Sequence, residues 1–258
     1  MSEVQSAGTA DVAPIATLDL VATTLTRLAQ RCSGVPGIGV LYGPAGWGKT
    51  FATNALALES RAYYVSMRSA WRTKTMLEKI LFEMGIAHGR HTNAALLDLV
   101  CEQLSRSGRA LIIDEFDYCT KSDTLVELTC DLYEGSHGAL LLVGEELLPR
   151  KLERWERFHS RVLTWAPAPP VTLADAIALS PLYAPGVSLA PDVLSHLVEL
   201  ARGSVRRVCV NLVALREYAM TYGLAEVSIE DIKGVPLYTG RAPTRRALSE
   251  TARPVRVS

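Results

Sequence analysis

The strongest constraint on the fold is an eight-residue stretch, Gly43-Pro44-Ala45-Gly46-Trp47-Gly48-Lys49-Thr50. It fits the pattern G-x-x-x-x-G-K-[ST] at every position. The apolar run at 38–42 predicts a buried strand before it, and residues 51–57 predict a helix after it. In that context backbone N–H groups and the positive end of the helix dipole can face an anion. The stretch therefore predicts a phosphate-binding loop.

The residue types in this loop suit a nucleoside triphosphate. The Lys49 side chain can reach the β- and γ-phosphates, and the Thr50 hydroxyl can bind Mg²⁺. We therefore predict ATP and Mg²⁺ as cofactors, in preference to an ordinary glycine-rich turn. Trp47 is unusual in such a loop, and packing against a lid or a neighbouring subunit is the one role the sequence offers it. The residues predicted to bind the cofactor are Gly43, Pro44, Ala45, Gly46, Trp47, Gly48, Lys49, Thr50 and Phe51.

A second motif ends the apolar run at 109–113, where Asp114 and Glu115 follow. Acids at the carboxyl end of a buried strand lie where open α/β sheets bind ligands. We predict that Asp114 holds the Mg²⁺ shell through water, and that Glu115 polarises the water that attacks the γ-phosphate. Acids often simply end strands, so this motif gains its weight from the phosphate loop upstream. Together the two motifs predict ATP hydrolysis rather than passive nucleotide binding.

The composition of the 258 residues is that of a globular protein, with 48% apolar and 21% charged residues. No apolar run is long enough to span a bilayer, and the N-terminus up to Pro14 lacks the segments of a signal peptide. The five cysteines form no C-x-x-C pair, which favours free thiols over zinc or disulfides. We therefore expect a cytoplasmic protein with no membrane partner.

Charge is uneven along the chain, although the formal net charge is zero. Residues 1–200 hold 17 Lys and Arg against 22 Asp and Glu, whereas residues 201–258 hold 10 against 5. A basic end on an acidic body can indicate contact with nucleic acid or with an acidic partner. Solvated surface charge explains the same distribution about equally well.

Strand-like and helix-like segments alternate along the first two thirds of the chain. This alternation predicts an α/β fold, with a largely parallel sheet and helices on both faces. After the phosphate-loop strand and helix, strands are predicted at 62–66, 138–144 and 161–165, and in the run 109–115 that ends in the two acids. Further helices are predicted at 17–32, 75–84, 93–105 and 122–134.

Three prolines between 167 and 170 break the alternation, because proline continues neither a helix nor a central strand. Beyond them we predict a small helical bundle without comparable strands, with helices from 172 and at 191–201, 205–222 and 228–233. The predicted organisation is a disordered N-terminus (1–15), an α/β nucleotide-binding domain (16–166), a helical lid (171–235) and a basic flexible tail (236–258).

An α/β nucleotide domain followed by a helical lid, with both motifs in this order, resembles the AAA+ ATPases over residues 16–235. The resemblance implies a P-loop NTPase core. Gly203-Ser204-Val205-Arg206 resembles the second sensor of that family, which implies that Arg206 reaches the γ-phosphate and couples the lid to the nucleotide. Residues 157–162 resemble the segment that carries an arginine finger. This implies that Arg161, or Arg157 as second choice, acts on a neighbouring subunit's ATP.

One element departs from the AAA+ pattern. The first sensor of that family is usually a small polar residue after the fourth strand. Here that strand ends in Val143-Gly144-Glu145-Glu146, without Asn, Ser or Thr. The water-positioning role therefore has no predicted residue, and hydrolysis is expected to be slow and stimulated by assembly.

Within the AAA+ class, the segments 111–117, 131–134, 142–147 and 157–162 resemble the transposition helper ATPases typified by phage Mu transposition protein B. The resemblance implies a homo-oligomer, ring or helical filament, that assembles with ATP on double-stranded DNA, selects target DNA and activates a transposase. It also implies a bacterial host cell, as for a phage or mobile element. The Mu protein has an N-terminal helix-turn-helix domain, and we expect none in the roughly fifteen residues before the core here.

A basic segment follows the second predicted strand, where Arg68, Arg72 and Lys74 alternate with polar residues and Trp71. Such side chains at a helix start suit DNA phosphates, and contacts of this kind are independent of sequence and sensitive to salt. In related helper ATPases this region faces the channel that holds DNA. We predict DNA contacts here, supported by Arg241, Arg245 and Arg246 in the tail. A solvated loop with Trp71 packed on the core is the alternative.

Two other functional classes remain open on the sequence alone. An initiator-like or DNA-loading ATPase shares the core but usually carries a winged helix after the lid. A protein-directed switch ATPase acts through an oligomeric ring and predicts no stimulation by DNA.

Overall fold

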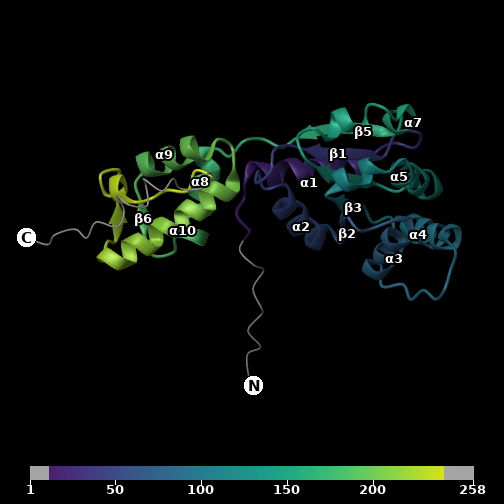
Figure 1. Cartoon of the computed structure of the whole chain (residues 1–258), viewed down its shortest axis with the longest axis horizontal. Coiled ribbons are helices and arrows are strands. Elements are labelled where there is room, and N and C mark those ends of the chain that lie inside the picture. Colours follow the sequence, from purple (N-terminus) through teal and green to yellow (C-terminus); the bar gives the residue numbers. More distant parts are fainter. Residues whose placement is uncertain (1–11, 241–258) are drawn as a thin grey trace, which may run out of the picture. The chain divides into compact units, whose positions relative to one another are not determined.

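The structure, a computed structural model, describes residues 12–240 and divides into two compact units. One unit spans Ala16–Pro169, and the other combines the residues before Ala16 with those from Pro170 onward (Figure 1). The division falls within the proline-rich segment that ends the alternation of strands and helices. The residues predicted to be disordered at 1–11 and the tail arginines Arg241, Arg245 and Arg246 lie outside the described residues.

The first unit is built on a five-stranded sheet in which all neighbouring strands run parallel, in the order β2-β3-β4-β1-β5. Parallel strands place their carboxyl ends on one edge of the sheet, where open α/β folds bind ligands. The predicted α/β fold is confirmed. The strands are β1 (Ile38–Tyr42), β2 (Tyr63–Ser66), β3 (Leu111–Asp114), β4 (Leu140–Gly144) and β5 (Val162–Pro167).

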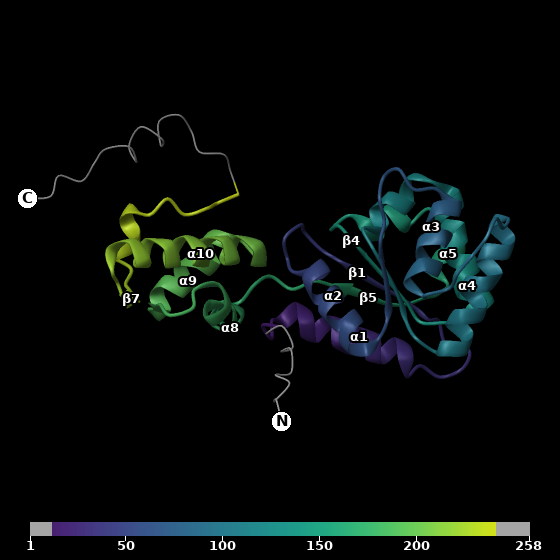
Figure 2. The ribbon, with the colours of Figure 1, turned by 90° about the horizontal axis from the view of Figure 1, so that it is seen from below.

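Helices cover both faces of this sheet (Figure 2). The helices α1 and α2 pack on one face, whereas α3, α4 and α5 pack on the other. Two short helices and one 3-10 turn, none of which the sequence predicts, complete the unit. The helices are α1 (Ala16–Ala29), α2 (Lys49–Ser60), α3 (Thr73–Glu83), α4 (Asn93–Ser107), the 3-10 turn η1 (Phe116–Lys121), α5 (Asp123–Ser136), α6 (Leu148–Leu152) and α7 (Glu156–His159).

The core follows the two-residue period of the strands. In β3, Leu111 and Ile113 belong to the core on the α3–α5 side, and Ile112 belongs to the core on the α1–α2 side. All five residues of β4 are buried. Strands buried on both faces read as continuous apolar runs, which explains why these strands stand out in the sequence. Pro167 ends β5, the last strand of the described sheet, where an edge position tolerates proline.

The second unit contains three helices around a small core. As predicted, the first of them begins with a capping box: the Thr172 hydroxyl accepts from the Asp175 N–H at 3.2 Å, and the Asp175 carboxylate accepts from the Thr172 N–H at 2.7 Å. The elements are α8 (Leu173–Tyr183), β6 (Ser188–Leu189), α9 (Pro191–Ala201), α10 (Val205–Tyr222), β7 (Glu226–Val227) and the 3-10 turn η2 (Asp231–Gly234).

The second unit differs from expectation at two elements. It contains a parallel pair of two-residue strands, β6 and β7, that are too short to produce an alternating pattern in the sequence. The last predicted helix, at 228–233, is the 3-10 turn η2 at 231–234. The Asp231 carboxylate accepts hydrogen bonds from the Ser228 N–H and hydroxyl, and this local cap suits a turn.

The structure also differs from the prediction in the described parts of the two terminal segments, residues 12–15 and 236–240. In the N-terminal segment, Ala13 and Ile15 are buried rather than disordered. In the C-terminal segment, the fully buried Asn211 amide bonds both backbone groups of Tyr238, at 2.6 Å and 3.1 Å. A buried amide requires partners, and these two bonds tie residues 236–240 to α10.

Among residues 12–240, no helix is both long and apolar enough to cross a membrane. All five cysteines are free thiols in the structure. Cys101, Cys119 and Cys130 are buried, Cys209 is half-buried and Cys32 is exposed.

Candidate active site

The predicted phosphate loop connects β1 to α2 and opens at the carboxyl edge of the sheet. Gly46 and Gly48 both have φ of 83°, a left-handed conformation that glycine adopts without strain. The helix α2 begins at Lys49, directly after Gly48. The loop therefore presents the N-terminus of a twelve-residue helix, whose free N–H groups and dipole favour an anion.

The Lys49 ammonium lies over its own loop. Its Nζ donates to the carbonyl oxygens of Gly43 at 2.6 Å and Pro44 at 2.8 Å. Burial lowers the pKa of Lys49, and the nearby carboxylates of Asp114 and Glu115 oppose that shift. Lys49 therefore lies within electrostatic range of both acids, which follow it by 65 and 66 positions in the sequence.

Trp47 has a structural role within its own unit. Its side chain packs against the apolar core on the α1–α2 side of the sheet, and its carbonyl oxygen accepts from the Thr17 hydroxyl at 3.0 Å. These contacts tie the tip of the loop to α1. Phe51, in the first turn of α2, is 40% exposed.

Asp114 ends β3 and is almost completely buried, with 2% of its surface exposed. One carboxylate oxygen accepts from the Tyr64 hydroxyl and the other from the Glu115 N–H, each at 2.7 Å. Burial and the Asp114 charge raise the pKa of Tyr64, so the phenol stays protonated and remains a donor. Tyr64 was not predicted as a site residue, because its contact with Asp114 depends on the pairing of β2 with β3.

Glu115 has a left-handed backbone, with φ of 54° and ψ of 38°, at the start of the turn η1. This conformation is uncommon for a residue with a side chain, and it is frequent at functional sites. Burial, followed by the charges of Asp114 and Asp117, raises the pKa of the Glu115 carboxyl. A raised pKa makes the carboxylate a better proton acceptor, which suits the predicted general base.

The donor set fits Mg²⁺ bound together with a nucleotide. It offers one carboxylate, Asp114, and one hydroxyl, that of the exposed Thr50 at the start of α2. Residues 12–240 contain no group of three or more His, Cys, Asp or Glu side chains arranged to hold a metal by themselves. Mg²⁺ in phosphate sites is typically held by one or two protein oxygens, with phosphate oxygens and water completing its shell.

Comparison with known proteins supports the α/β nucleotide-binding fold. Residues 33–152, which hold the phosphate loop and the Asp114-Glu115 pair, match the profile of a family described as the AAA domain. No curated protein sequence matches the chain.

Solved structures of AAA+ ATPases share the architecture of the AAA domain. Orc1 of Aeropyrum pernix, solved in complex with DNA, is 22% identical with a TM-score of 0.59, over 84% of this chain and 63% of its own. Cdc6p of Pyrobaculum aerophilum is 17% identical with a TM-score of 0.58, over 84% and 64%. The Thermotoga maritima RuvB Holliday junction branch migration motor is 16% identical with a TM-score of 0.58, over 84% and 67%. These likenesses show the fold, and the chain spans less than two thirds of the length of the first two proteins.

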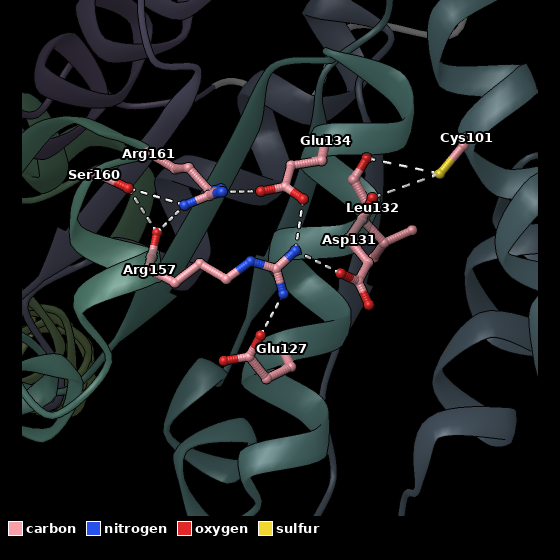
Figure 3. A network of polar contacts seen from close by, with 8 residues as sticks. All are labelled: Cys101, Glu127, Asp131, Leu132, Glu134, Arg157, Ser160 and Arg161. Atoms are coloured by element: carbon pink, nitrogen blue, oxygen red, sulfur yellow. Dashed lines mark hydrogen bonds and ion pairs between the residues drawn. The ribbon is translucent and has the colours of Figure 1, made fainter.

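Beside β5 of the AAA domain, Arg157 and Arg161 meet the acids of α5 (Figure 3). The Arg157 guanidinium pairs with Glu127, with Asp131 at 2.8 Å and with Glu134 at 2.6 Å. Arg161 pairs with Glu134 alone, and it also donates to the Ser160 hydroxyl at 2.9 Å and to the Arg157 carbonyl. Three acids anchor Arg157, whereas one acid holds Arg161.

Arg161 lies at the edge of the sheet opposite the phosphate loop. Its carbonyl oxygen accepts from the Ile38 N–H at 3.1 Å, where β1 begins, whereas the loop follows the end of β1. Five strand residues separate the two, or roughly 16 Å at about 3.3 Å per residue. Arg161 also lines an open hollow of about 840 Å³ with Arg31, Glu134 and His137. A γ-phosphate that Arg161 contacts must therefore belong to another subunit.

The remaining predicted side chains are exposed on their own segments. Arg68, Arg72 and Lys74 are exposed where the chain leaves β2 and starts α3, at the carboxyl edge of the sheet. Trp71 between them packs partly on the core, as the alternative interpretation of this segment expects. In the second unit, Arg206 is exposed in the first turn of α10, one residue after the start of the helix. The roles assigned to all these residues stay predictions.

Proposed function

We propose that this protein is an ATP hydrolase of the AAA+ class. The observation that carries the proposal is the placement of the phosphate loop, after β1, and of the Asp114-Glu115 pair, at the end of β3, at the carboxyl edge of one parallel sheet. Mg²⁺, when bound, would supply positive charge to the phosphates. Thr50 and Asp114 would hold the ion, and Tyr64 would orient the Asp114 carboxylate.

The chain's own groups divide the work of hydrolysis. The glycine-rich loop and the N–H groups of α2 bind and orient the phosphates. Lys49 adds a positive charge there, after exchanging its bonds to the Gly43 and Pro44 carbonyls for phosphate oxygens. Glu115, next to the Mg²⁺ ligand, accepts the proton of the attacking water.

In this proposal, a second subunit supplies an arginine that completes the active site. Arg161 is too far from the loop of its own chain, and a single acid restrains it, which favours it over Arg157 as the arginine offered to a neighbour. An arginine supplied in trans stabilises charge on the transferring phosphoryl group. Arg206, in the second unit, is the proposed link between nucleotide state and the helical lid.

Arg161→Ala should leave the monomer folded and able to bind ATP, yet remove the hydrolysis that depends on assembly. The lost ion pair is partly exposed and contributes at most about 1 kcal/mol. An arginine finger contributes on the order of 10³-fold or more to turnover. Mixing provides the measurement: Arg161→Ala subunits keep the phosphate loop, and Lys49→Ala subunits keep the finger, so the mixture should regain activity.

Arg154→Ala is the matched control, because it also removes an arginine and an ion pair, with Asp123, from the same region. It should leave turnover unchanged. A mixture that co-assembles, as shown by light scattering, and still gains no activity would argue against a finger acting between subunits.

We further propose that the assembled protein binds double-stranded DNA and serves as a helper to a transposase. The exposure of Arg68, Arg72 and Lys74 at the ligand-binding edge supports the DNA contact. Two proteins of the same fold support it as well, one solved with DNA and one described as a Holliday junction motor. The transposase partner rests on the resemblance of residues 111–117, 131–134, 142–147 and 157–162 to the transposition helpers.

Arg72→Ala/Lys74→Ala should weaken ATP-dependent binding to duplex DNA of any sequence. Each lost phosphate contact should lower the slope of log affinity against log salt by roughly one unit, because fewer counterions are released. Titrations with and without ATP, at low and moderate salt, provide the measurement. Lys79→Ala/Arg90→Ala is the matched control, because it removes the same charge from two exposed positions, one farther along α3 and one in the loop after it. This variant should keep the wild-type slope of log affinity against log salt.

The outcome of these titrations separates the functional classes. Wild-type protein that binds no DNA at low salt with ATP present would favour the protein-directed switch ATPase. Binding that survives in Arg72→Ala/Lys74→Ala and disappears on deletion of residues 240–258 would move the DNA contact to the tail. Electron microscopy of the ATP-bound protein on DNA would distinguish a ring from a filament, and stimulation of a transposase would separate a transposition helper from an initiator-like loader.

A further inference from the structure

A buried carboxylate joins three segments next to the proposed active site. Asp117 lies in η1 with 8% of its surface exposed. One oxygen accepts from the Lys151 ammonium of α6 at 2.6 Å, and the other accepts from the Glu145 N–H, just after β4, also at 2.6 Å. The hydrogen bond with Asp117 raises the pKa of Lys151 and keeps it cationic. Both oxygens are therefore occupied by charged or backbone donors.

Gly144 makes room for this carboxylate. A Cβ atom built on Gly144 would overlap the Asp117 oxygen that bonds to the Glu145 N–H, and it would lie 2.6 Å from the Leu148 side chain. The φ angle of Gly144 is not in the left-handed region, so space rather than backbone conformation requires glycine here. The end of β4 and the Asp117 carboxylate thus fit each other closely.

The same turn carries Glu115. Its left-handed backbone costs roughly 1–2 kcal/mol for a residue with a side chain, so other contacts must hold it. On one side, the Glu115 N–H donates to Asp114 at 2.7 Å. On the other, the Glu115 carbonyl accepts from the Tyr118 N–H at 3.0 Å, within the turn that Asp117 fastens to β4 and α6.

We propose that Asp117 is a positioning residue for Glu115: by fastening η1 to the end of β4 and to Lys151, it holds the general base in its left-handed conformation. The inference rests on the proposed ATP hydrolysis for its consequence in catalysis. Asp117 itself is not proposed as a second base, because it is only 8% exposed and its carboxylate is ion-paired with Lys151.

The first test is Asp117→Asn, which keeps the shape but presents an NH₂ group to one of the two donors. We expect kcat to fall about 10- to 100-fold, since misplacement of a catalytic group by about 1 Å costs up to that factor, and the affinity for Mg²⁺-ATP to change less than about twofold. Asp123→Asn, on an exposed acid just beyond the turn, should match the wild type. An unchanged kcat, or an equal loss of ATP affinity, would overturn the positioning role.

Lys151 provides a test by conservative replacement. Lys151→Met removes the ion pair with Asp117, which is one of the two interactions of that carboxylate. It should lower kcat by less than Asp117→Asn does, because the hydrogen bond from the Glu145 N–H to Asp117 remains. Lys151→Arg restores a cationic donor and should recover most of the lost turnover. If methionine and arginine act alike, the Asp117–Lys151 pair does not position Glu115.

A third measurement is independent of ATP turnover. Hydrogen exchange followed by NMR should show the Glu145 amide and the amides of η1 exchanging at least about tenfold faster in Asp117→Asn, with α5 unaffected. Unchanged protection of the Glu145 amide would overturn the inference even if turnover fell. Conversely, a wild-type protein without ATPase activity would refute the proposed function, while the exchange rates would still decide whether Asp117 fastens the turn.

Gly144→Ala tests the fit from the other side. The added methyl must displace the Asp117 carboxylate, so the variant should unfold at a lower temperature and show the same fast exchange at Glu145. Asp117→Ala/Gly144→Ala removes the overlap with the carboxylate, while the Leu148 side chain must still shift, and it should unfold about 2–4 °C higher than Gly144→Ala alone. A double variant that is less stable than either single variant would contradict the proposed packing.

Discussion

Lys49→Ala should abolish ATP binding. The side chain is the one cation among the described groups that both motifs place at the phosphates, and its Nζ donates to two loop carbonyls, those of Gly43 and Pro44. A hydrogen bond to a charged group contributes about 1.5–3 kcal/mol, and two such bonds to phosphates correspond to a loss of affinity on the order of 100-fold or more. Isothermal titration of Mg²⁺-ATP against the variant provides the measurement.

Two comparisons make this result specific. Lys79→Ala removes an exposed lysine from α3, which packs on the sheet without contributing to the loop, and should bind ATP as the wild type does. The thermal unfolding of Lys49→Ala without nucleotide should stay close to that of the wild type, because burial opposes the charge of Lys49 rather than stabilising it. Normal ATP affinity in Lys49→Ala would refute the central proposal.

Glu115→Gln should keep ATP binding and ATP-dependent assembly but lose turnover by roughly 10²- to 10⁴-fold. The amide has the shape of the carboxylate, and the backbone N–H of residue 115 still donates to Asp114, but the amide cannot accept the proton of the attacking water. Single-turnover release of phosphate from preformed protein–ATP complex separates this chemical step from binding. Assembly can be followed by light scattering in the same samples.

Glu146→Gln is the matched control, because Glu146 is an exposed acid two residues beyond the end of β4. It should turn over ATP as fast as the wild type. Residual turnover in Glu115→Gln would require another base, and Asp117 is the nearest acid in the sequence after the proposed Mg²⁺ ligand Asp114. The structure argues against that choice, since Asp117 is only 8% exposed and its carboxylate is ion-paired with Lys151.

Local patterns carry most of what the sequence predicts about this fold. The helices α9 and α10 begin and end at the predicted residues 191–201 and 205–222, because a proline at the start, a serine cap and glycine at the end mark their limits. The phosphate loop and the acids after β3 are likewise contiguous segments. The short helices α6 and α7 and the strands β6 and β7 escape prediction, since elements of two to five residues hold too little periodicity.

Hydrogen bonds and ion pairs between residues far apart in the sequence cannot be predicted from local patterns. Tyr64 bonds Asp114 across 50 positions, and Lys151 bonds Asp117 across 34. Both contacts depend on which strands are neighbours and in what register they pair. The three acids that meet Arg157 and Arg161 are spaced along α5, at 127, 131 and 134, and helical spacing predicts only that they share a face.

The close fit between Gly144 and Asp117 has a consequence for how related sequences can vary. A side chain at position 144 and an acid at position 117 compete for the same volume, so neither site can change independently of the other. Relatives that place serine, threonine or asparagine at the end of this strand should therefore carry a smaller residue, without a carboxylate, at the position of Asp117. Relatives that keep the acid should keep the glycine. Evolution along this lineage would then proceed by paired replacement, with the strand end and the turn exchanging which of them supplies the polar group.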